Sequence, residues 1–116
     1  MNAAAKKWVK ALRSGKYKQT IGHLADETGF CCLGVACELA KQAGIIPDYN
    51  GTNGNLPTRV QNWLGLQDCF GKIDGNRKYN DLTSYNDFGK WSFKKIANLI
   101  ERQPKGLFKE AKRGHR

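Results

Sequence analysis

The stretch from Phe30 to Gly44, FCCLGVACELAKQAG, decides the fold because it predicts a helix that is apolar on nearly every side. Four apolar residues at intervals of one, three and four fall on one side of this helix, predicted over residues 33–42: Leu33, Ala36, Cys37 and Ala40. Val35 and Leu39 widen that side until the helix is apolar nearly all round. A helix of this kind must be covered by other elements, so we expect it at the centre of the core. Gly44 supplies its C-terminal stop.

A second helix is predicted near the N-terminus, over about residues 3–12, with Asn2 as its N-cap. Its apolar stripe consists of Trp8, Val9 and Leu12. Lys6, Lys10 and Arg13 recur at intervals of four and three, so they share another face of the same helix. We therefore expect this helix to pack with one face and to present a cationic one.

Strand and turn signals lie between these two helices. Residues 17–25 alternate in side-chain character, which is typical of a strand. The sequence Asp26-Glu27-Thr28-Gly29 indicates a turn, followed by a short returning strand over residues 30–32. This segment is therefore predicted to be a small β-hairpin.

The second half of the chain predicts a short helix over 57–64, a second hairpin around 74–76, a helical turn over 81–88 and a last helix over 92–101. The predicted fold class is therefore α+β, with about four main helices and one or two short β-hairpins in a single compact domain over residues 1–103. The basic segment 104–116 is predicted to be a C-terminal tail that is disordered or becomes ordered on a partner.

The net charge of +10 is concentrated at the two ends of the chain. Residues 1–20 hold six basic side chains and no acid, residues 101–116 hold six basic and two acidic ones, and residues 21–100 are neutral overall. Such ends can hold nucleic acid, an acidic protein surface or an anionic nucleotide, and the simpler alternative is a solvated face. The predicted anion-binding residues are Lys6, Lys10, Arg13, Lys16 and Lys18, with Arg113 and Arg116 assisting.

Length and composition exclude several classes of protein. The 116 residues suit one domain rather than a multidomain enzyme. The longest strongly apolar stretch, Phe30 to Cys37, is too short to cross a bilayer, and the N-terminus lacks the apolar segment of a secretory signal. We therefore expect no membrane association, and thiols that sit in a reducing cytosol.

The four cysteines, Cys31, Cys32, Cys37 and Cys69, lack the paired Cys-x-x-Cys spacing of zinc sites. We therefore predict buried free thiols, no metal and no cofactor. One alternative is a Cys–His nucleophile, because the predicted hairpin places His23 opposite Cys32, where a histidine would lower the pKa of the thiol. No third orienting group is evident, so we do not expect an enzyme. The polar run YNDLTSYND, residues 79–87, is interpreted mainly as helix-capping side chains.

Three blocks of sequence occur in a characteristic order: KWVKALRSGKYKQTIGHLADETGFCCLGVACELAKQAG (7–44), LPTRVQNWLGL (56–66) and LTSYNDFGKWSFKKIANLIE (82–101). Over about residues 7–101 the chain resembles a family of small, mostly uncharacterised proteins encoded by tailed bacteriophages. The resemblance implies a viral gene product, complete as a short chain, that acts in the cytoplasm of a host bacterium. The family has no established catalytic residue or cofactor, so the resemblance transfers no site residue to this chain.

We therefore hypothesise a phage accessory protein that binds stoichiometrically and inhibits a host or defence factor, such as a nuclease or a CRISPR-type complex. Its basic surface would contact DNA or RNA, or an acidic protein face, within a host protein or nucleoprotein complex. The first alternative is a sponge that sequesters an anionic nucleotide signal. The second is a Cys-dependent enzyme that uses Cys31 or Cys32 with His23.

Overall fold

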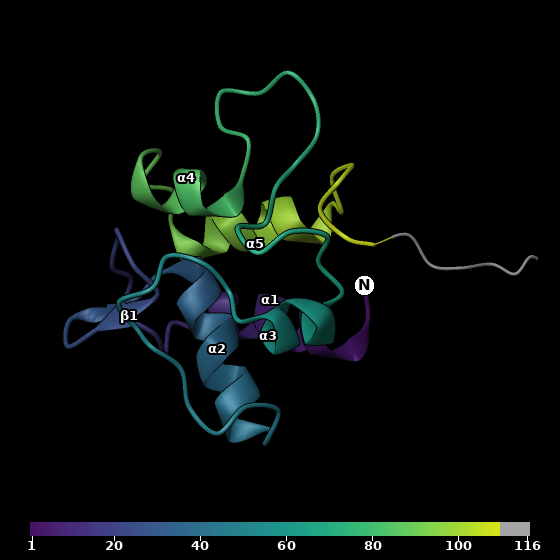
Figure 1. Cartoon of the computed structure of the whole chain (residues 1–116). Coiled ribbons are helices and arrows are strands. Elements are labelled where there is room, and N and C mark those ends of the chain that lie inside the picture. Colours follow the sequence, from purple (N-terminus) through teal and green to yellow (C-terminus); the bar gives the residue numbers. More distant parts are fainter. Residues whose placement is uncertain (110–116) are drawn as a thin grey trace, which may run out of the picture.

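The helix α2 (Cys32–Gln42) lies at the centre of the fold, as its apolar pattern predicts. The computed structural model describes residues 1–109, and within them α2 contacts α1, α3, α4 and the hairpin (Figure 1). The other elements are α1 (Ala3–Arg13), β1 (Ala25–Asp26), β2 (Gly29–Phe30), α3 (Thr58–Leu64), α4 (Leu82–Asp87) and α5 (Phe93–Glu101). These elements form a single α+β domain, so the predicted fold class is confirmed.

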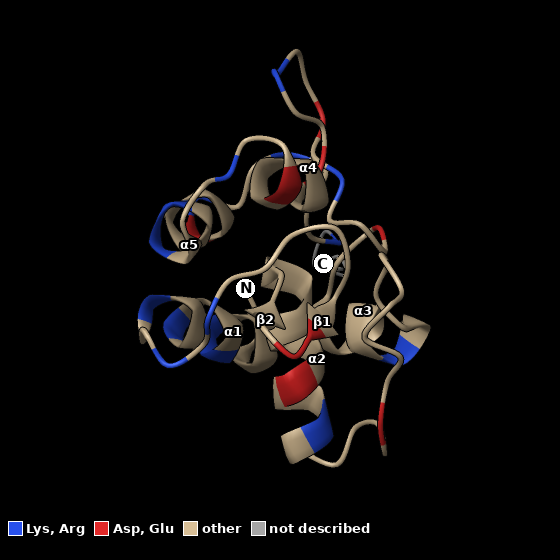
Figure 2. Ribbon diagram, turned by 90° about the vertical axis from the view of Figure 1, so that its left-hand side faces the viewer, with Lys and Arg blue, Asp and Glu red and all other residues tan. Residues whose placement is uncertain are grey.

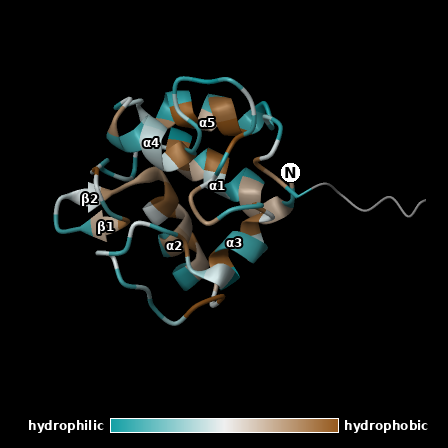
Figure 3. Ribbon diagram, turned by 45° about the horizontal axis from the view of Figure 1, so that its top comes forward, coloured by the Kyte–Doolittle hydropathy of each residue, from teal (hydrophilic) through white to brown (hydrophobic). Residues whose placement is uncertain are grey.

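The helices α1 and α5 lie side by side and form the most extensive helix pair in the described part of the chain. Both begin at a polar cap that the sequence predicts. The Asn2 side chain accepts a hydrogen bond from the Ala5 N–H at 2.8 Å, and the Ser92 hydroxyl accepts one from the Lys95 N–H at 3.2 Å. Each helix then buries one stripe and exposes the other, which Figure 3 shows as alternating brown and teal.

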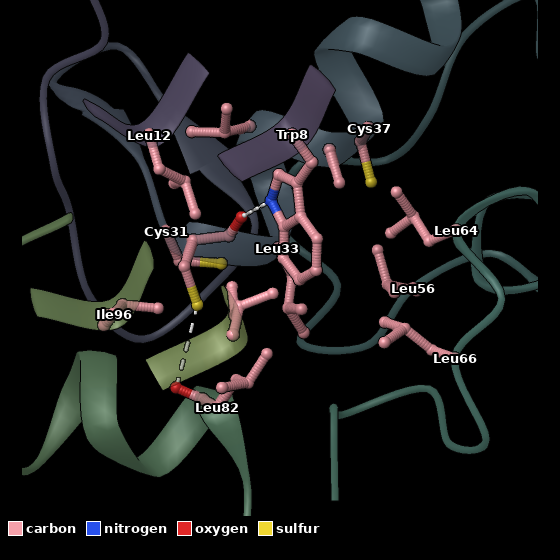
Figure 4. Close-up of a cluster of buried hydrophobic side chains, with 14 of the residues drawn as sticks. Trp8, Leu12, Cys31, Leu33, Cys37, Leu56, Leu64, Leu66, Leu82 and Ile96 are labelled. Atoms are coloured by element: carbon pink, nitrogen blue, oxygen red, sulfur yellow. Dashed lines mark hydrogen bonds between the residues drawn. The ribbon is translucent and has the colours of Figure 1, made fainter. Parts of the chain in front are cut away.

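Trp8 joins α1 to α2 inside the core. Its side chain is fully buried, and its indole Nε1–H donates to the backbone oxygen of Cys32 at 2.9 Å (Figure 4). The Cys32 thiol is also fully buried and donates to the backbone oxygen of Leu82 in α4, with an S–O distance of 3.7 Å. A buried indole N–H requires a partner, and here the partner fixes α1 against the first turn of α2.

The hairpin of β1 and β2 is much shorter than the sequence predicts. Ala25 pairs with Phe30 and Asp26 with Gly29 in an antiparallel register. Most of the predicted strand over residues 17–25 lies outside any strand. The prediction of a strand over residues 17–25 is therefore wrong for most of this segment, whose backbone is irregular although its side chains alternate in character.

The segment before the hairpin is held by Phe30 on the edge of β2 that faces away from β1. The Phe30 N–H donates to the Lys18 oxygen at 2.8 Å, and the Phe30 oxygen accepts from the Thr20 N–H at 2.7 Å. Gly29 permits this close approach, because a Cβ there would lie 2.4 Å from the Lys18 oxygen. The bonds produce an isolated parallel bridge between Gln19 and Phe30, in place of a long strand.

Asn86, at the end of α4, is fully buried and satisfies its polar atoms through several segments. Its oxygen accepts from the Gln19 side chain at 2.8 Å and from the Cys32 N–H at 3.2 Å. Its amide donates to the Thr20 backbone oxygen and to the Asp87 carboxylate, each at 2.9 Å. Buried polar groups of this kind are stable when paired, so Asn86 fixes the segment around residue 19 against α2 and α4.

The predicted second hairpin around residues 74–76 is reduced to one antiparallel bridge, between Lys72 and Asp81. The Asp81 carboxylate caps α4 by accepting from the Ser84 N–H at 2.8 Å, as the capping interpretation predicts. Beyond α5, Leu107 is fully buried, and its oxygen accepts from the Gln67 N–H at 3.0 Å. Residues 104–109, the first part of the predicted tail, therefore pack against the domain.

Candidate functional site

Lysines line the exposed side of α1. The side of this helix that contains Trp8 and Leu12 packs into the core, where both residues are almost fully buried. Lys6, Lys7 and Lys10 are left exposed on the remaining circumference. Since Lys6 and Lys10 are about one helical turn apart, their charges are separated by roughly 6 Å along the axis.

The neighbouring helix α5 adds further cations to the same side of the molecule. Phe93 and Ile96 face the core, while Lys94, Lys95 and Arg102 are exposed. Figure 2 shows Lys and Arg gathered on the outer sides of α1 and α5. We call this surface the basic face, and its members are Lys6, Lys7, Lys10, Arg13, Lys16, Lys94, Lys95 and Arg102.

The structure gathers most of the anion-binding residues predicted from the sequence, but they are not equivalent. Lys6, Lys10 and Lys16 line cavities on the basic face. Lys18 is exposed just beyond them, in the segment that pairs with Phe30. The remaining two predicted residues, Arg113 and Arg116, lie outside the described residues.

Arg13 differs from Lys6, Lys10 and Lys16 because it already forms an ion pair. Its guanidinium donates to the Glu101 carboxylate and to the Asn98 side-chain oxygen, each at 2.6 Å. The hydrogen bond to Glu101 raises the pKa of Arg13 above its ordinary value. Arg13 is therefore a link between α1 and α5, and an incoming anion would have to compete with Glu101 for it.

The cations of α5 are the members of the basic face that the sequence interpretation missed. Their segment lies in residues 21–100, which carry no net charge, so a count of charge along the chain hides Lys94 and Lys95. The available signal was their position in the last helix, between the core residues Phe93 and Ile96. Combining that helical spacing with the contact between α1 and α5 identifies the surface.

Two shallow cavities flank α1. One of about 190 Å³ lies between α1 and α5 and is lined by Lys6, Lys10 and Arg13 together with Glu101. The other, of about 240 Å³, lies between α1 and the end of α2. Lys10 lines both, so it stands on the ridge that separates them.

The cavity between α1 and α2, which we call the Tyr17 cavity, combines three lysines with an aromatic ring. Lys7, Lys10 and Lys16 line it together with Tyr17. The Tyr17 ring contacts Phe30 edge to face, with centroids 5.5 Å apart. Because Phe30 also holds the backbone at residues 18–20, the ring sits on a fixed support.

A third cavity, of about 290 Å³, follows the exposed side of α5 and includes Trp91, Lys95 and Arg102. A fourth, of about 430 Å³, lies near Met1 and Gly65, and among residues 1–109 Lys109 is the one basic side chain that lines it. The fourth cavity is larger, but the part of the chain that the structure describes places no cluster of cations around it, so its size alone does not make it the better anion site. The basic face and its three cavities are therefore the candidate site.

The thiols and the histidine are not arranged as a nucleophilic pair. His23 lies 2.5 Å from the Asp26 carboxylate through its Nε2. Asp26 also accepts from the Thr28 hydroxyl at 2.5 Å and from two backbone N–H groups, those of Thr28 and Gly29. The hydrogen bond from Thr28, followed by that from His23, holds the pKa of Asp26 well below its usual range.

The cysteines next to the hairpin have structural partners. The Cys31 sulfur caps α2 by accepting from the Gly34 N–H at 3.4 Å. Burial raises the pKa of Cys31 to about 11 and that of Cys37 to about 12, and it raises the pKa of Cys32 as well. Activation of a nucleophile requires the opposite shift. The predicted free, buried thiols are confirmed for these three residues, while Cys69 is partly exposed.

Within residues 1–109, no group of three or more His, Cys, Asp or Glu side chains is placed to hold a metal ion. In the same residues, no helix has both the length and the apolarity needed to span a membrane.

The chain belongs to the family described as "Domain of unknown function (DUF8296)", whose match covers residues 1–104. Comparison with curated proteins and with solved structures finds no match.

Proposed function

We propose that this chain is a non-enzymatic binding protein whose basic face binds the phosphates of nucleic acid. The observation that carries the proposal is the gathering of cations from two helices, α1 and α5, on one side of the domain (Figure 2). A cationic surface binds a polyanion because each neutralised phosphate releases condensed counterions. The opposite sides of the same helices supply the core, so the charges do not disturb the packing.

The spacing of the lysines suits a phosphate backbone. Lys6 and Lys10 are about 6 Å apart along α1, and phosphates of one strand in a duplex are about 3.4 Å apart along its axis. One lysine for every second phosphate is therefore within reach of a strand that follows α1. Lys94 and Lys95 on α5 would contact a strand that crosses between the two helices.

We further propose that the protein acts stoichiometrically as a phage accessory protein in the cytoplasm of its host. In that setting the basic face would occupy the nucleic acid of a nuclease or of a CRISPR-type complex and so inhibit it. The support for this role is the resemblance of residues 7–101 to tailed-phage proteins together with the basic face. A binder of this kind needs no catalytic group.

The proposal is tested by charge reversal at Lys6, Lys10 and Lys16, measured by the fluorescence anisotropy of a labelled oligonucleotide. These three side chains are exposed and have no ion-pair partner within residues 1–109, so the triple variant should fold normally. We expect affinity to fall at least about tenfold. Arg13 is left unchanged because its reversal would also break the link to α5.

The matched control reverses Lys72, Arg77 and Lys78 in the exposed loop before α4. This control changes the net charge by the same amount but leaves the basic face intact. The proposal requires the control to bind almost as tightly as the unmodified protein. Equal losses in the two triple variants would show a non-specific effect of net charge and would contradict it.

An acidic protein surface is the other partner that this charge distribution suits. Capture of the tagged protein from a host lysate, with and without nuclease treatment, separates the two cases. If nucleic acid is the ligand, nuclease removes the captured host factor. A factor retained equally well after nuclease treatment would indicate direct contact between proteins and would contradict the proposed phosphate contact.

A further inference from the structure

The Tyr17 cavity offers a way to distinguish the forms of nucleic acid that the proposed function leaves open. We infer that it receives one unpaired base, stacked on Tyr17, so that the face prefers single-stranded over double-stranded nucleic acid. This inference rests on the proposed function and names its substrate class. The observation behind it is an aromatic residue, Tyr17, in the lining of a cavity that three lysines also line, Lys7, Lys10 and Lys16.

The lining of this cavity combines apolar residues with lysines. Ala11 and Leu39 line it in addition to Tyr17, and its three lysines are exposed residues. A nucleotide in a strand has the same two parts, a flat ring and a charged phosphate. Stacking on an aromatic side chain contributes favourably for every base, since each base presents a π-face.

The volume of the cavity limits what it can hold. At about 240 Å³, it is smaller than the roughly 300–1,000 Å³ of typical small-molecule pockets. It suits one planar ring, with the sugar and phosphate outside on the rim. A complete signalling nucleotide would be enclosed poorly, so the cavity favours a segment of a strand over a free nucleotide.

Tyr17 and Trp91 are aromatic residues that line cavities of the basic face, and Tyr17 is the better placed of the two for stacking. Trp91 has the Lys95 ammonium 4.2 Å from its ring centroid and the Tyr85 ring 4.5 Å away, centroid to centroid. Its ring is therefore already in contact with two neighbours. Tyr17 has one aromatic neighbour, Phe30, which meets it edge to face and holds it in position beside the cavity.

A duplex cannot use this cavity without losing a base pair. Extruding a base costs a few kcal/mol in general, which is about as much as one stacked base returns. A duplex would therefore bind through phosphates alone, whereas a single strand would use both phosphates and the cavity. The difference predicts tighter binding of single strands.

The test compares a labelled single strand of about 12 nucleotides with the same strand annealed to its complement. The unmodified protein should bind the single strand about tenfold more tightly, and Tyr17→Leu should remove that preference. Tyr17→Phe keeps the ring and should keep the preference. Uridine monophosphate, used as competitor, should displace the strand only weakly, because a free nucleotide fills the cavity without the neighbouring phosphate contacts.

A second variant guards against a folding defect in Tyr17→Leu. Ala11→Leu fills the cavity from α1 without changing any charge and should also abolish the preference for single strands. The base site would be overturned if the unmodified protein bound the single strand and the duplex equally well and neither variant changed these affinities. If reversal of Lys6, Lys10 and Lys16 still lowered both affinities, the proposed phosphate binding would stand. Absence of binding to either strand would overturn the proposed function itself, and the base site with it.

Discussion

Arg13 in α1 and Glu101 in α5 form an ion pair of 2.6 Å that joins the two helices of the basic face. The hydrogen bond from Arg13, followed by its positive charge, lowers the pKa of Glu101, so the carboxylate stays ionised at neutral pH. The Arg13 side chain is 36% exposed and that of Glu101 55%, and ion pairs exposed to this degree contribute little to stability. The greater effect of Glu101 is to cancel one positive charge on the surface proposed to bind phosphate.

Removing the charge of Glu101 is therefore expected to tighten nucleic-acid binding. In Glu101→Gln, Arg13 becomes available and the basic face gains one net positive charge. The affinity should rise severalfold at low salt, with little change in melting temperature. The matched control is Asp74→Asn, in the exposed loop before α4, which should leave affinity nearly unchanged. A decrease in affinity for Glu101→Gln would mean that the ion pair organises the site rather than masking it.

Gly34 in α2 is predicted to be irreplaceable, because α2 crosses the backbone of Leu24 there. A Cβ at position 34 would lie 1.8 Å from the Leu24 oxygen, which already accepts a hydrogen bond from the Cys31 N–H at 2.9 Å. Alanine gains about 1 kcal/mol of helix propensity over glycine, but overpacking against backbone costs about 1–3 kcal/mol or more. Gly34→Ala should thus lower the free energy of unfolding in urea denaturation.

The control for that substitution is Gly54→Ala, where a Cβ meets no atom within 4 Å. We expect its free energy of unfolding to stay within experimental error of the unmodified protein. If Gly34→Ala were as stable as Gly54→Ala, the close crossing of α2 over Leu24 would be incorrect.

The thiols should differ sharply in reactivity. Cys31, Cys32 and Cys37 are buried with raised pKa values, while Cys69 is partly exposed. Treatment of the native protein with iodoacetamide near pH 8 should add one label, at Cys69, and treatment in guanidinium should add four. Mass spectrometry gives the count and the position. Rapid labelling of native Cys31 would contradict the buried cap and would favour a Cys-dependent enzyme.

The stability of the hairpin should decrease in acid through Asp26. Its pKa is depressed in the folded protein, whereas an unfolded aspartate has a pKa of about 3.9. The stabilisation is therefore complete above about pH 5 and is lost as the pH falls toward 2. In Asp26→Asn this loss should be absent, so its melting temperature should fall less between pH 5 and pH 2. Parallel melting curves for the two proteins over that range would show that Asp26 is not responsible.

Local signals predicted the helices well, because caps and apolar stripes act over a few residues. Asn2 and Ser92 begin α1 and α5 as expected, and the apolar run from residue 33 to 42 became the central helix. The sequence did not reveal Cys31 as the cap of α2. Its side chain accepts the bond that serine or aspartate usually accepts at such a position.

The incorrect predictions concern segments whose hydrogen bonds are made with distant residues. Residues 17–25 alternate like a strand, yet Phe30 and the buried Asn86 hold this segment in a mostly irregular path. Leu107 looked like part of a tail because its neighbours are charged, but it is buried beside the segment that follows α3. Likewise, Lys94, Lys95 and Arg102 join the basic face only through the contact between α1 and α5, which no local pattern shows.

The central claim, that the basic face binds nucleic acid through phosphate contacts, is tested most directly by the salt dependence of binding. Affinity for a labelled single strand should be measured by anisotropy over a series of potassium chloride concentrations. If about five lysines each neutralise one phosphate, the slope of log K against log salt concentration should be about −3 to −4, since each contact contributes roughly −0.7. A slope near zero would contradict the account.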